Sequence, residues 1–455
     1  MRVSSPPARS PPDFGHTARQ FFQLDPQYTN LNHGTAGAIP RHVEDASQDL
    51  SSHISANPDR FLYFQYQPML YEARQQVAEL IGAETSECVF VPNVSHGINT
   101  VLRNFEWEDP DVLLVTNCSS KTISAAAQYI SDTRPHPILS EFKLLFPETR
   151  SSILRRFRAH IRSLRSTSKT NAKVVAVFES ISATPGVVMP WREMVQICKA
   201  NDVWSVVDAA HALGQERDID LSSAAPDFWV SSCSKWMYAK HGCAVLYVPK
   251  RNHHVIKSAF PTSSTYDHPA QYEEELQLKF CCTLDFTAPL SIKAALEFRS
   301  FLGGEDRINQ YCHYLALAGG KRLSEVMNTH MLYPPEDPES ELFTANMVRQ
   351  SGLGILLQVN MTRIRAEVNV VIPLSGSIQP STRIIRMLQD GLLNRHNVSA
   401  TQFYHNGKWW TRASAQVYNE VGDFDKLGHA LLLVCAEIES VTSDLDTATT
   451  PVSSS

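Results

Sequence analysis

Short apolar runs alternate with helical patterns between about residues 85 and 250. The runs have the length and the β-rich composition of buried strands, and they are CVFV (88–91), DVLLV (111–115), VVAVF (174–178), VWSVV (203–207) and CAVLYV (243–248). Between two of them, Trp191, Met194, Val195 and Cys198 keep the spacing of one apolar helix face, and Pro190 introduces it. This alternation predicts an α/β fold with a mostly parallel sheet that is covered on both faces.

The pattern changes after about residue 300. A helical stretch over 303–327 is followed by a β-like run at 354–361 and by further residues at helical spacing, which are Ile384, Leu388, Leu392, Leu427, Leu431, Val434 and Ile438. We expect a smaller α+β domain over 301–439 that follows a large domain over 56–300. Residues 1–18 and the tail from Ser440 to Ser455 are rich in Ser, Pro and Thr and are expected to be disordered.

Composition and charge exclude several classes of function. The net charge of the 455-residue chain is −6, and no long run of Lys or Arg marks a nucleic-acid or membrane surface. No apolar stretch approaches the roughly 20 residues that span a bilayer. The nine cysteines are an odd number without C-x-x-C spacing, which is typical of reduced thiols in the cytosol. These features predict a cytoplasmic protein that binds neither nucleic acid nor membrane.

Two residues carry the strongest chemical signal. Asp208 ends an apolar strand-like run, and ligands of open α/β sheets bind outside the carboxyl ends of strands. Lys235 follows the run DFWV (227–230) and lies between small polar residues and Trp236; a partly desolvated lysine has a nucleophilic neutral amine. Alone, Asp208 is as readily a helix cap and Lys235 a solvated side chain. Together they match the needs of pyridoxal phosphate (PLP), a lysine for the aldehyde and an acid for the ring nitrogen.

PLP also requires a phosphate site. Ser95, His96 and Gly97 stand between a strand-like run and a helical pattern, where backbone N–H groups and hydroxyls bind anions. Ser232 and Ser234 can add hydroxyls from the segment of Lys235. The alternatives are an ordinary serine N-cap for Ser95 and small turn residues for the other two serines.

Five motifs in order along the chain resemble one family. They are YTNLNHGTAGAIP (28–40), SHGINTVLR (95–103), DAAHALGQ (208–215), SKWMYAKHGCAVLYV (234–248) and RASAQVYN (412–419). Over about residues 20–440 the chain resembles the class V aminotransferase superfamily of PLP fold type I, within its isopenicillin N epimerase-like branch. Fungal members of that branch, including hercynylcysteine sulfoxide lyases, are the most similar. The resemblance implies a seven-stranded, mostly parallel sheet, an N-terminal segment (19–55) that lines the active site, and a homodimer with sites at the subunit boundary.

The resemblance also implies a role for each matching residue. Lys235 is the Schiff-base lysine, Asp208 is the partner of the ring nitrogen, and His211 lies near the phenolic oxygen of the ring. Ser95, His96, Ser232, Ser234 and Thr283 correspond to phosphate-binding positions, Thr283 being offered by the second subunit. Asn32 and His33 line the substrate pocket. Arg412 grips the substrate carboxylate, to which its planar fork is suited, although a solvated strand arginine is the alternative.

Three positions depart from the family pattern. Ser234 stands where relatives have His before the lysine, and Cys282 precedes Thr283 where they have Gly. Cys118, Ser119 and Ser120 stand where relatives carry an aromatic residue that stacks on the cofactor ring; its loss removes on the order of 1 kcal/mol of stacking.

The resemblance implies a PLP-dependent lyase that acts on the C–S bond of a sulfur-bearing or otherwise β/γ-substituted amino acid, in fungal secondary metabolism. An epimerase and an aminotransferase of a biosynthetic pathway are the alternatives within the enzyme class. A dimeric scaffold with weak or no activity is the alternative outside it.

Overall fold

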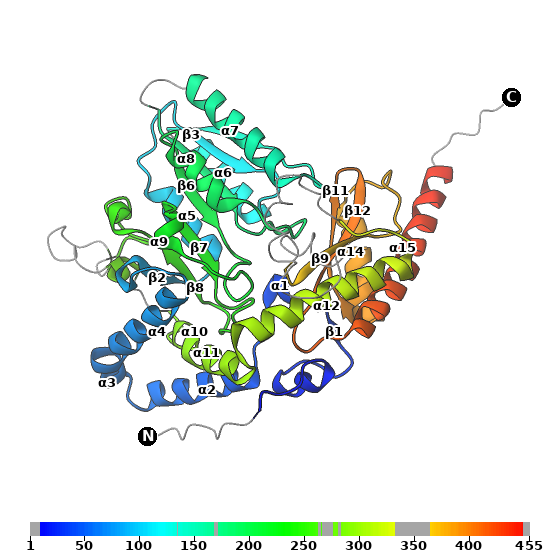
Figure 1. Cartoon of the computed structure of the whole chain (residues 1–455), viewed down its shortest axis with the longest axis horizontal. Helices are drawn as coiled ribbons and strands as arrows, with labels where there is room; N and C mark the ends of the chain where they lie inside the picture. The colour runs from blue at the N-terminus through cyan, green and yellow to red at the C-terminus, as the bar shows by residue number, and fades with distance from the viewer. Residues whose placement is uncertain are drawn as a thin grey trace, which may run out of the picture.

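The computed structural model describes residues 10–133, 135–167, 172–262, 265, 276–280, 284–332 and 365–448. Figure 1 shows two lobes, one built on a large sheet and the other on a small sheet, with helix α12 (Gly304–Met327) running along both. The prediction of an α/β fold with a second, smaller α+β region is confirmed. Thr283 and the β-like run at 354–361 lie outside the described residues.

The large lobe contains a seven-stranded sheet with strand order β2-β8-β7-β6-β5-β3-β4. Only β8 runs antiparallel to its neighbours, so the sheet is mostly parallel, as expected. The strands are β2 (Cys88–Val91), β3 (Val112–Thr116), β4 (Ile138–Phe142), β5 (Val174–Glu179), β6 (Trp204–Asp208), β7 (Phe228–Ser232) and β8 (Ala244–Tyr247). The pattern missed β4 because this edge strand is mostly exposed and lacks an apolar run.

Alternate residues of these strands enter two separate apolar cores. Val175 and Val177 pack on one face with helices α5 and α6, whereas Val174 and Ala176 pack on the other. A strand that is buried on both faces reads as a continuous apolar run, which is why the sequence predicts the central strands well. The helices of this lobe are α2 (Arg41–Ala56), α3 (Pro58–Arg60), α4 (Tyr66–Leu80), α5 (Val94–Asn104), α6 (Lys121–Asp132), α7 (Arg150–Thr167), α8 (Trp191–Lys199), α9 (Leu221–Ala224), α10 (Thr287–Leu290) and α11 (Ile292–Phe301).

Shorter helical turns complete the large lobe and its N-terminal approach. The 3₁₀ turns are η1 (His16–Phe21), η3 (Thr85–Glu87), η4 (Lys250–Asn252) and η5 (Leu276–Phe280), and η2 (Phe61–Gln65) is a π-helical turn. The helix predicted from Trp191 to Cys198 is α8, which begins directly after Pro190.

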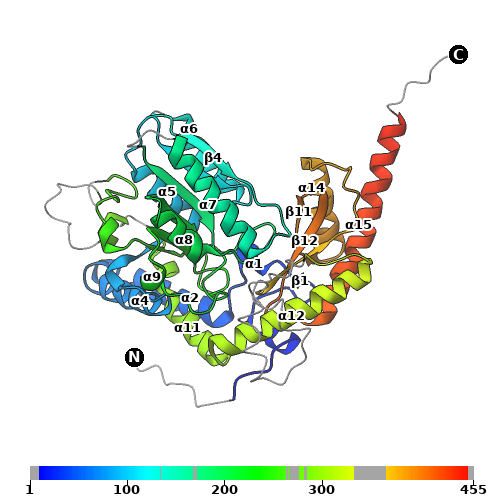
Figure 2. The same ribbon diagram turned by 45° about the horizontal axis from the view of Figure 1, so that its top comes forward.

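The small lobe is built on an antiparallel sheet with strand order β11-β12-β9. Its strands are β9 (Glu367–Val371), β11 (Thr401–His405) and β12 (Lys408–Ser414), and its helical elements are α14 (Thr382–Asp390), the π-helical turn η8 (Gly391–Arg395) and α15 (Val421–Ala448). A third apolar core joins them to α12. Figure 2 shows α15 extending beyond the rest of this lobe. Because α15 continues to Ala448, the expectation of disorder from Ser440 is wrong for residues 440–448.

The N-terminal segment connects the two lobes. Strand β1 (Thr29–Asn30) pairs in parallel with β10 (Val398–Ser399) of the small lobe, and helix α1 (His33–Ala36) follows at once. In Figure 1 α1 lies between the lobes. The segment therefore reaches the region where the carboxyl ends of the large sheet face the small lobe.

Candidate active site

The carboxyl edge of the large sheet gathers most of the predicted residues. Strand β6 ends at Asp208 and its parallel neighbour β7 ends at Ser232, with Asp208 opposite Val230 in the ladder. Lys235 follows β7 after a short turn. Its charge lowers the pKa of Asp208, and the charge of Asp208 raises the pKa of Lys235. The two residues on which the prediction depends therefore lie on one edge of the sheet and interact.

Lys235 has the environment of a reactive amine. Its Nζ lies 3.0 Å from Nε2 of His211. Burial, assisted by the charge of Arg412, lowers the pKa of Lys235 to about 8, although Glu367 and Asp208 oppose this shift. A sizeable fraction of the amine is therefore neutral near physiological pH, and a neutral amine is the nucleophilic form.

Asp208 has a carboxylate neighbour that the sequence analysis did not single out. Glu179 ends β5 and lies opposite Asp208 in the ladder. Burial, together with the adjacent Asp208, raises the pKa of Glu179 to about 7, while hydroxyl hydrogen bonds from Ser119 and Thr116 lower it. Burial also raises the pKa of Asp208. Two buried carboxyl groups side by side disfavour a double negative charge. Glu179 follows an apolar run as Asp208 does, so the same rule would have found it.

The predicted phosphate-binding residues lie at the same edge. Helix α5 begins beside the carboxyl end of β2, and both Val91 of β2 and Ser232 of β7 pair with Ala244 of β8. The N-cap of α5 is Asn93, whose side chain accepts from the backbone N–H of His96, so Ser95 is not the cap. The hydroxyls of Ser232 and Ser234 lie 3.2 Å apart. The helix start and the serine pair thus face the same end of the sheet.

Arg412 is held by a carboxylate that the sequence analysis missed. Its Nε forms a 3.0 Å ion pair with Glu367, and its two terminal nitrogens donate to the carbonyl of Ala183 and to the hydroxyls of Thr35 and Thr401. Arg412 is 2% exposed, so the alternative of a solvated strand arginine is wrong. The only sequence signal for Glu367 was a single acidic residue before the short, mostly apolar run at 368–372, in the part of the chain after residue 300 where the alternation of strands and helices is no longer regular.

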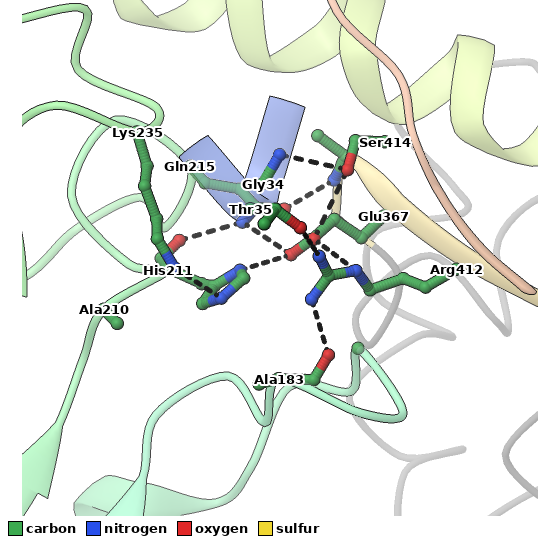
Figure 3. Close-up of polar contacts among 12 residues, drawn as sticks. Gly34, Thr35, Ala183, Ala210, His211, Gln215, Lys235, Glu367, Arg412 and Ser414 are labelled. Carbon is green, nitrogen blue, oxygen red and sulfur yellow. Dashed lines mark hydrogen bonds and ion pairs between the residues drawn. The ribbon is translucent and has the colours of Figure 1, made fainter. Parts of the chain in front are cut away.

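Glu367 also binds His211. Its Oε2 lies 2.8 Å from Nδ1 of His211, and Figure 3 shows Lys235, His211, Glu367 and Arg412 in one continuous chain of contacts. Burial raises the pKa of Glu367, but the charges of Arg412 and His211 and the hydrogen bond from His211 outweigh it and hold that pKa below its ordinary value. Burial lowers the pKa of His211 to about 4. The imidazole is therefore neutral and the carboxylate is ionised at neutral pH.

The two predicted N-terminal residues, Asn32 and His33, lie in different surroundings. Asn32 lines the cavity described below, and its side-chain oxygen accepts from the hydroxyls of Thr35 and Thr401 at 2.7 Å each. His33 does not line it. Its ring is fully buried and lies between the Tyr418 hydroxyl and the backbone carbonyl of Lys235, at 3.0 and 2.9 Å. His33 thus braces the backbone of Lys235, and its predicted substrate-binding role stays a prediction.

A cavity of about 500 Å³ opens between the lobes at this point. Its polar wall includes Lys235, His211 and Arg412, and Lys121 lies at its rim. Its apolar wall comes from α14 and η8 of the small lobe through Ile385, Leu388, Leu392 and Leu393. Such a cavity, apolar on one side with a few convergent polar groups on the other, is typical of a small-molecule site.

The position of the missing aromatic residue is polar. Cys118 is buried, and the Ser119 hydroxyl donates to Glu179. Ser120 caps α6 by accepting from the N–H of Ile123. These residues bind Glu179 and a helix start, so they do not replace a stacking ring.

The chain belongs to the class V aminotransferase family. The family model matches residues 29–366, a range that contains Glu179, Asp208, His211 and Lys235 but ends one residue before Glu367 and does not include Arg412 or the apolar wall from α14 and η8. The recognition made from the motifs is thus confirmed, and with it the expectation of a PLP-dependent enzyme.

Several individual proteins are similar to this chain in sequence or in fold. The chain is 32% identical to an L-cysteine desulfhydrase-like protein, lolT1, of Epichloe uncinata, over 93% of this chain and 96% of the relative. It is 28% identical to the hercynylcysteine sulfoxide lyase of Schizosaccharomyces pombe, over 93% and 98% of the two chains. The fold is similar to that of the cystine C–S lyase C-DES, with a TM-score of 0.70, 17% identity and coverage of 89% and 97%.

The residues at the carboxyl edge fit PLP. Asp208 is 5% exposed, and its Oδ1 accepts from the N–H of Ala210, while no described residue donates to its Oδ2. This leaves a buried acceptor for a protonated ring nitrogen.

No group of three or more His, Cys, Asp or Glu within the described ranges has the arrangement of a metal site. In the same part of the chain, no helix has the length and apolar character needed to cross a bilayer.

Proposed function

We propose that the protein is a PLP-dependent lyase that cleaves the C–S bond of a sulfur-bearing amino acid. The observation that carries this proposal is the convergence of Lys235, His211 and Arg412 on one cavity, with the buried carboxylate of Asp208 close enough to Lys235 to shift its pKa. The names of the relatives, L-cysteine desulfhydrase-like protein and hercynylcysteine sulfoxide lyase, support the choice of bond.

Each residue has a distinct task in this proposal. Bound PLP supplies an electron sink for the negative charge that develops at the substrate α-carbon. Lys235 would hold the cofactor through its Nζ, and once the substrate amine has displaced it, the freed Nζ would accept the α-proton, for which a lowered pKa is suited. Asp208 stabilises a positive charge on the ring nitrogen. Arg412 binds the substrate carboxylate through its terminal nitrogens, while Glu367 holds its Nε.

The phosphate-binding roles follow from the edge of the sheet. Ser95 and His96, at the start of α5, would donate to the phosphate together with Ser232 and Ser234. Asn32 would contact substrate from the rim, since it lines the cavity. Thr283 would bind the phosphate from the second subunit, which is the role that the resemblance implies.

The decisive experiment mixes the PLP-loaded protein with a panel of amino acids that includes L-cysteine, L-cystine and an S-substituted cysteine sulfoxide. Release of pyruvate and ammonia with the sulfur fragment supports the lyase. Loss of the α-hydrogen in deuterated water without any release refutes it and favours epimerisation or half-transamination. Epimerisation is the second candidate, because the chain is 28% identical to the isopenicillin N epimerase of Streptomyces clavuligerus over 51% of its length.

A scaffold without activity is tested more simply. The protein should show a visible absorbance band that borohydride shifts, and Lys235→Ala should abolish it. A wild-type protein that stays colourless after addition of PLP would support the scaffold.

We also propose a cytoplasmic homodimer. The seven described cysteines are all unpaired, which supports a reducing compartment.

Residues of η2 and α4 support the homodimer, because they form an exposed apolar patch in which Tyr63 and Phe64 are 79% and 76% exposed. Such patches are typical of protein interfaces. Analytical ultracentrifugation should give twice the chain mass, and Tyr63→Ser with Phe64→Ser should reduce it. A wild-type monomer would refute the dimer.

A further inference from the structure

Glu367 links the two lobes at the reactive lysine. It belongs to β9 of the small lobe, whereas His211 and Lys235 belong to the large lobe. The carboxylate is 2% exposed and uses its two oxygens separately, Oε1 for Arg412 at 3.0 Å and Oε2 for His211 at 2.8 Å.

The contact between Glu367 and His211 determines which ring nitrogen carries the hydrogen. An ionised carboxylate only accepts hydrogen bonds, so Nδ1 of His211 must donate to Glu367. In a neutral imidazole the other nitrogen then has a free electron pair. Nε2 therefore accepts the hydrogen bond from Nζ of Lys235, 3.0 Å away.

The surrounding chain is built to admit this carboxylate. Gly34 lies so close that a Cβ atom at its position would stand 2.9 Å from Cδ of Glu367 and closer still to Oε1. The backbone N–H of Gly34 donates to Ser414, next to Glu367. Gln215 donates to the backbone carbonyl of His211 and accepts from the N–H of Ala366, the residue before Glu367. Its side chain therefore connects the backbone at His211 with the backbone at Glu367, the two residues that we call the dyad.

We propose that Glu367 is a positioning residue that fixes His211 as the Nδ1–H tautomer, and that His211 thereby orients the amine of Lys235. With one N–H directed at Nε2 of His211, rotation of the neutral amine is restricted, and its electron pair and remaining hydrogen are turned away from His211. The inference deepens the proposed function, since it concerns how Lys235 is presented to the cofactor aldehyde.

The charged groups around Lys235 give the expected pH dependence. Arg412 of β12 lowers the pKa of Lys235, and Asp208 of β6 and Glu367 of β9 raise it. His211 is neutral at neutral pH, and His33 of α1 binds only the backbone carbonyl. Loss of the charge of Glu367 should therefore move the pKa of Lys235 below about 8, because a group that favours the ammonium form is removed.

The first test is the tautomer of His211 in the wild-type full-length chain. Ring-¹⁵N histidine labelling and long-range ¹H–¹⁵N correlation, with the His211 signals assigned by their loss in His211→Gln, should show hydrogen on Nδ1. Hydrogen on Nε2 would overturn the proposal without the need for any variant at Glu367.

The second test is the rate at which PLP attaches to Lys235 as a function of pH, followed by absorbance in full-length protein freed of PLP. Glu367→Gln should lower the midpoint of this profile and also reduce the plateau rate about tenfold, because the amide no longer enforces one tautomer. Glu367→Asp keeps the charge and should keep the midpoint. Glu216→Gln is the matched control, because Glu216 is another buried carboxylate paired with an arginine, Arg192.

The outcomes separate the two proposals. A profile of Glu367→Gln that matches the wild type in midpoint and plateau would overturn the role of Glu367, and so would an equal change in Glu216→Gln. Failure of the wild type to attach PLP at all would refute the proposed function, while the tautomer measurement would still decide the role of Glu367.

Discussion

The buried carboxyl of Glu179 should make the stability of the protein fall as the pH rises. It has a pKa of about 7 in the folded chain against an ordinary value of 4.5. A group whose pKa is raised on folding contributes stability that is fully present below its unfolded pKa and is lost as the pH rises through the folded value. The relevant window is therefore about pH 4.5 to 7.

The magnitude follows from the two pKa values. With about 1.4 kcal/mol for each pKa unit, the full contribution is about 3.5 kcal/mol, of which about 2.5 kcal/mol is lost between pH 5 and pH 8. Glu179→Gln keeps the size of the side chain and one acceptor oxygen, and its NH2 group can donate to the second of the two hydroxyls of Ser119 and Thr116, but it never ionises. The free energy of unfolding of this variant, relative to wild type, should rise by that amount over the same interval.

Urea unfolding followed by tryptophan fluorescence, at fixed protein concentration and at half-unit steps from pH 5 to pH 8, measures this difference. Glu79→Gln, at an exposed position on α4, is the control and should give a flat difference. A flat difference for Glu179→Gln as well would refute the reasoning, since it would mean that Glu179 ionises alike in the folded and unfolded chain.

Three further substitutions test other parts of the site. Gly34→Ala should lower the free energy of unfolding by about 1–3 kcal/mol, because its Cβ would meet the carboxylate of Glu367; an unchanged urea midpoint would contradict the close packing. Arg412→Lys keeps the charge but loses the fork, so KM for the amino-acid substrate should rise about tenfold or more with PLP absorbance unchanged; an unchanged KM would remove Arg412 from substrate binding. Asp208→Asn should retain the borohydride-sensitive band but abolish α-hydrogen exchange, and normal exchange rates would contradict its proposed role as the partner of the ring nitrogen.

The large sheet was predictable because its central strands are buried on both faces. Continuous runs such as VVAVF have no polar interruption, and the acidic residue at the end of such a run, Asp208, marks the carboxyl edge. Strand β4 was missed because only Phe142 of its five residues is buried, so the strand lacks a continuous apolar run. The order of the strands and the reversal of β8 depend on pairing across the sheet, which a local pattern does not encode.

The site was predictable only where a motif surrounds it. Lys235, Asp208 and His211 lie in recognisable strings, and the structure brings them to one edge. Glu367 lies 132 positions after Lys235 in a stretch without such a string, and only the packing of the small lobe against the large one brings it to His211. His33 shows the converse: its motif was recognised, but its ring turns inward to the Lys235 carbonyl because Tyr418 closes the other side.

The division of the dyad between lobes makes the state of the lysine depend on how the lobes meet. Any separation of β9 from the large sheet would leave His211 without the acceptor for its Nδ1 hydrogen, whereas Glu367 and Arg412 would stay together on the paired strands β9 and β12. Loss of this one contact would therefore release the ring of His211, and with it the hydrogen-bond acceptor that orients the amine of Lys235. In this chain the orientation of the reactive amine therefore depends on contact between the two lobes.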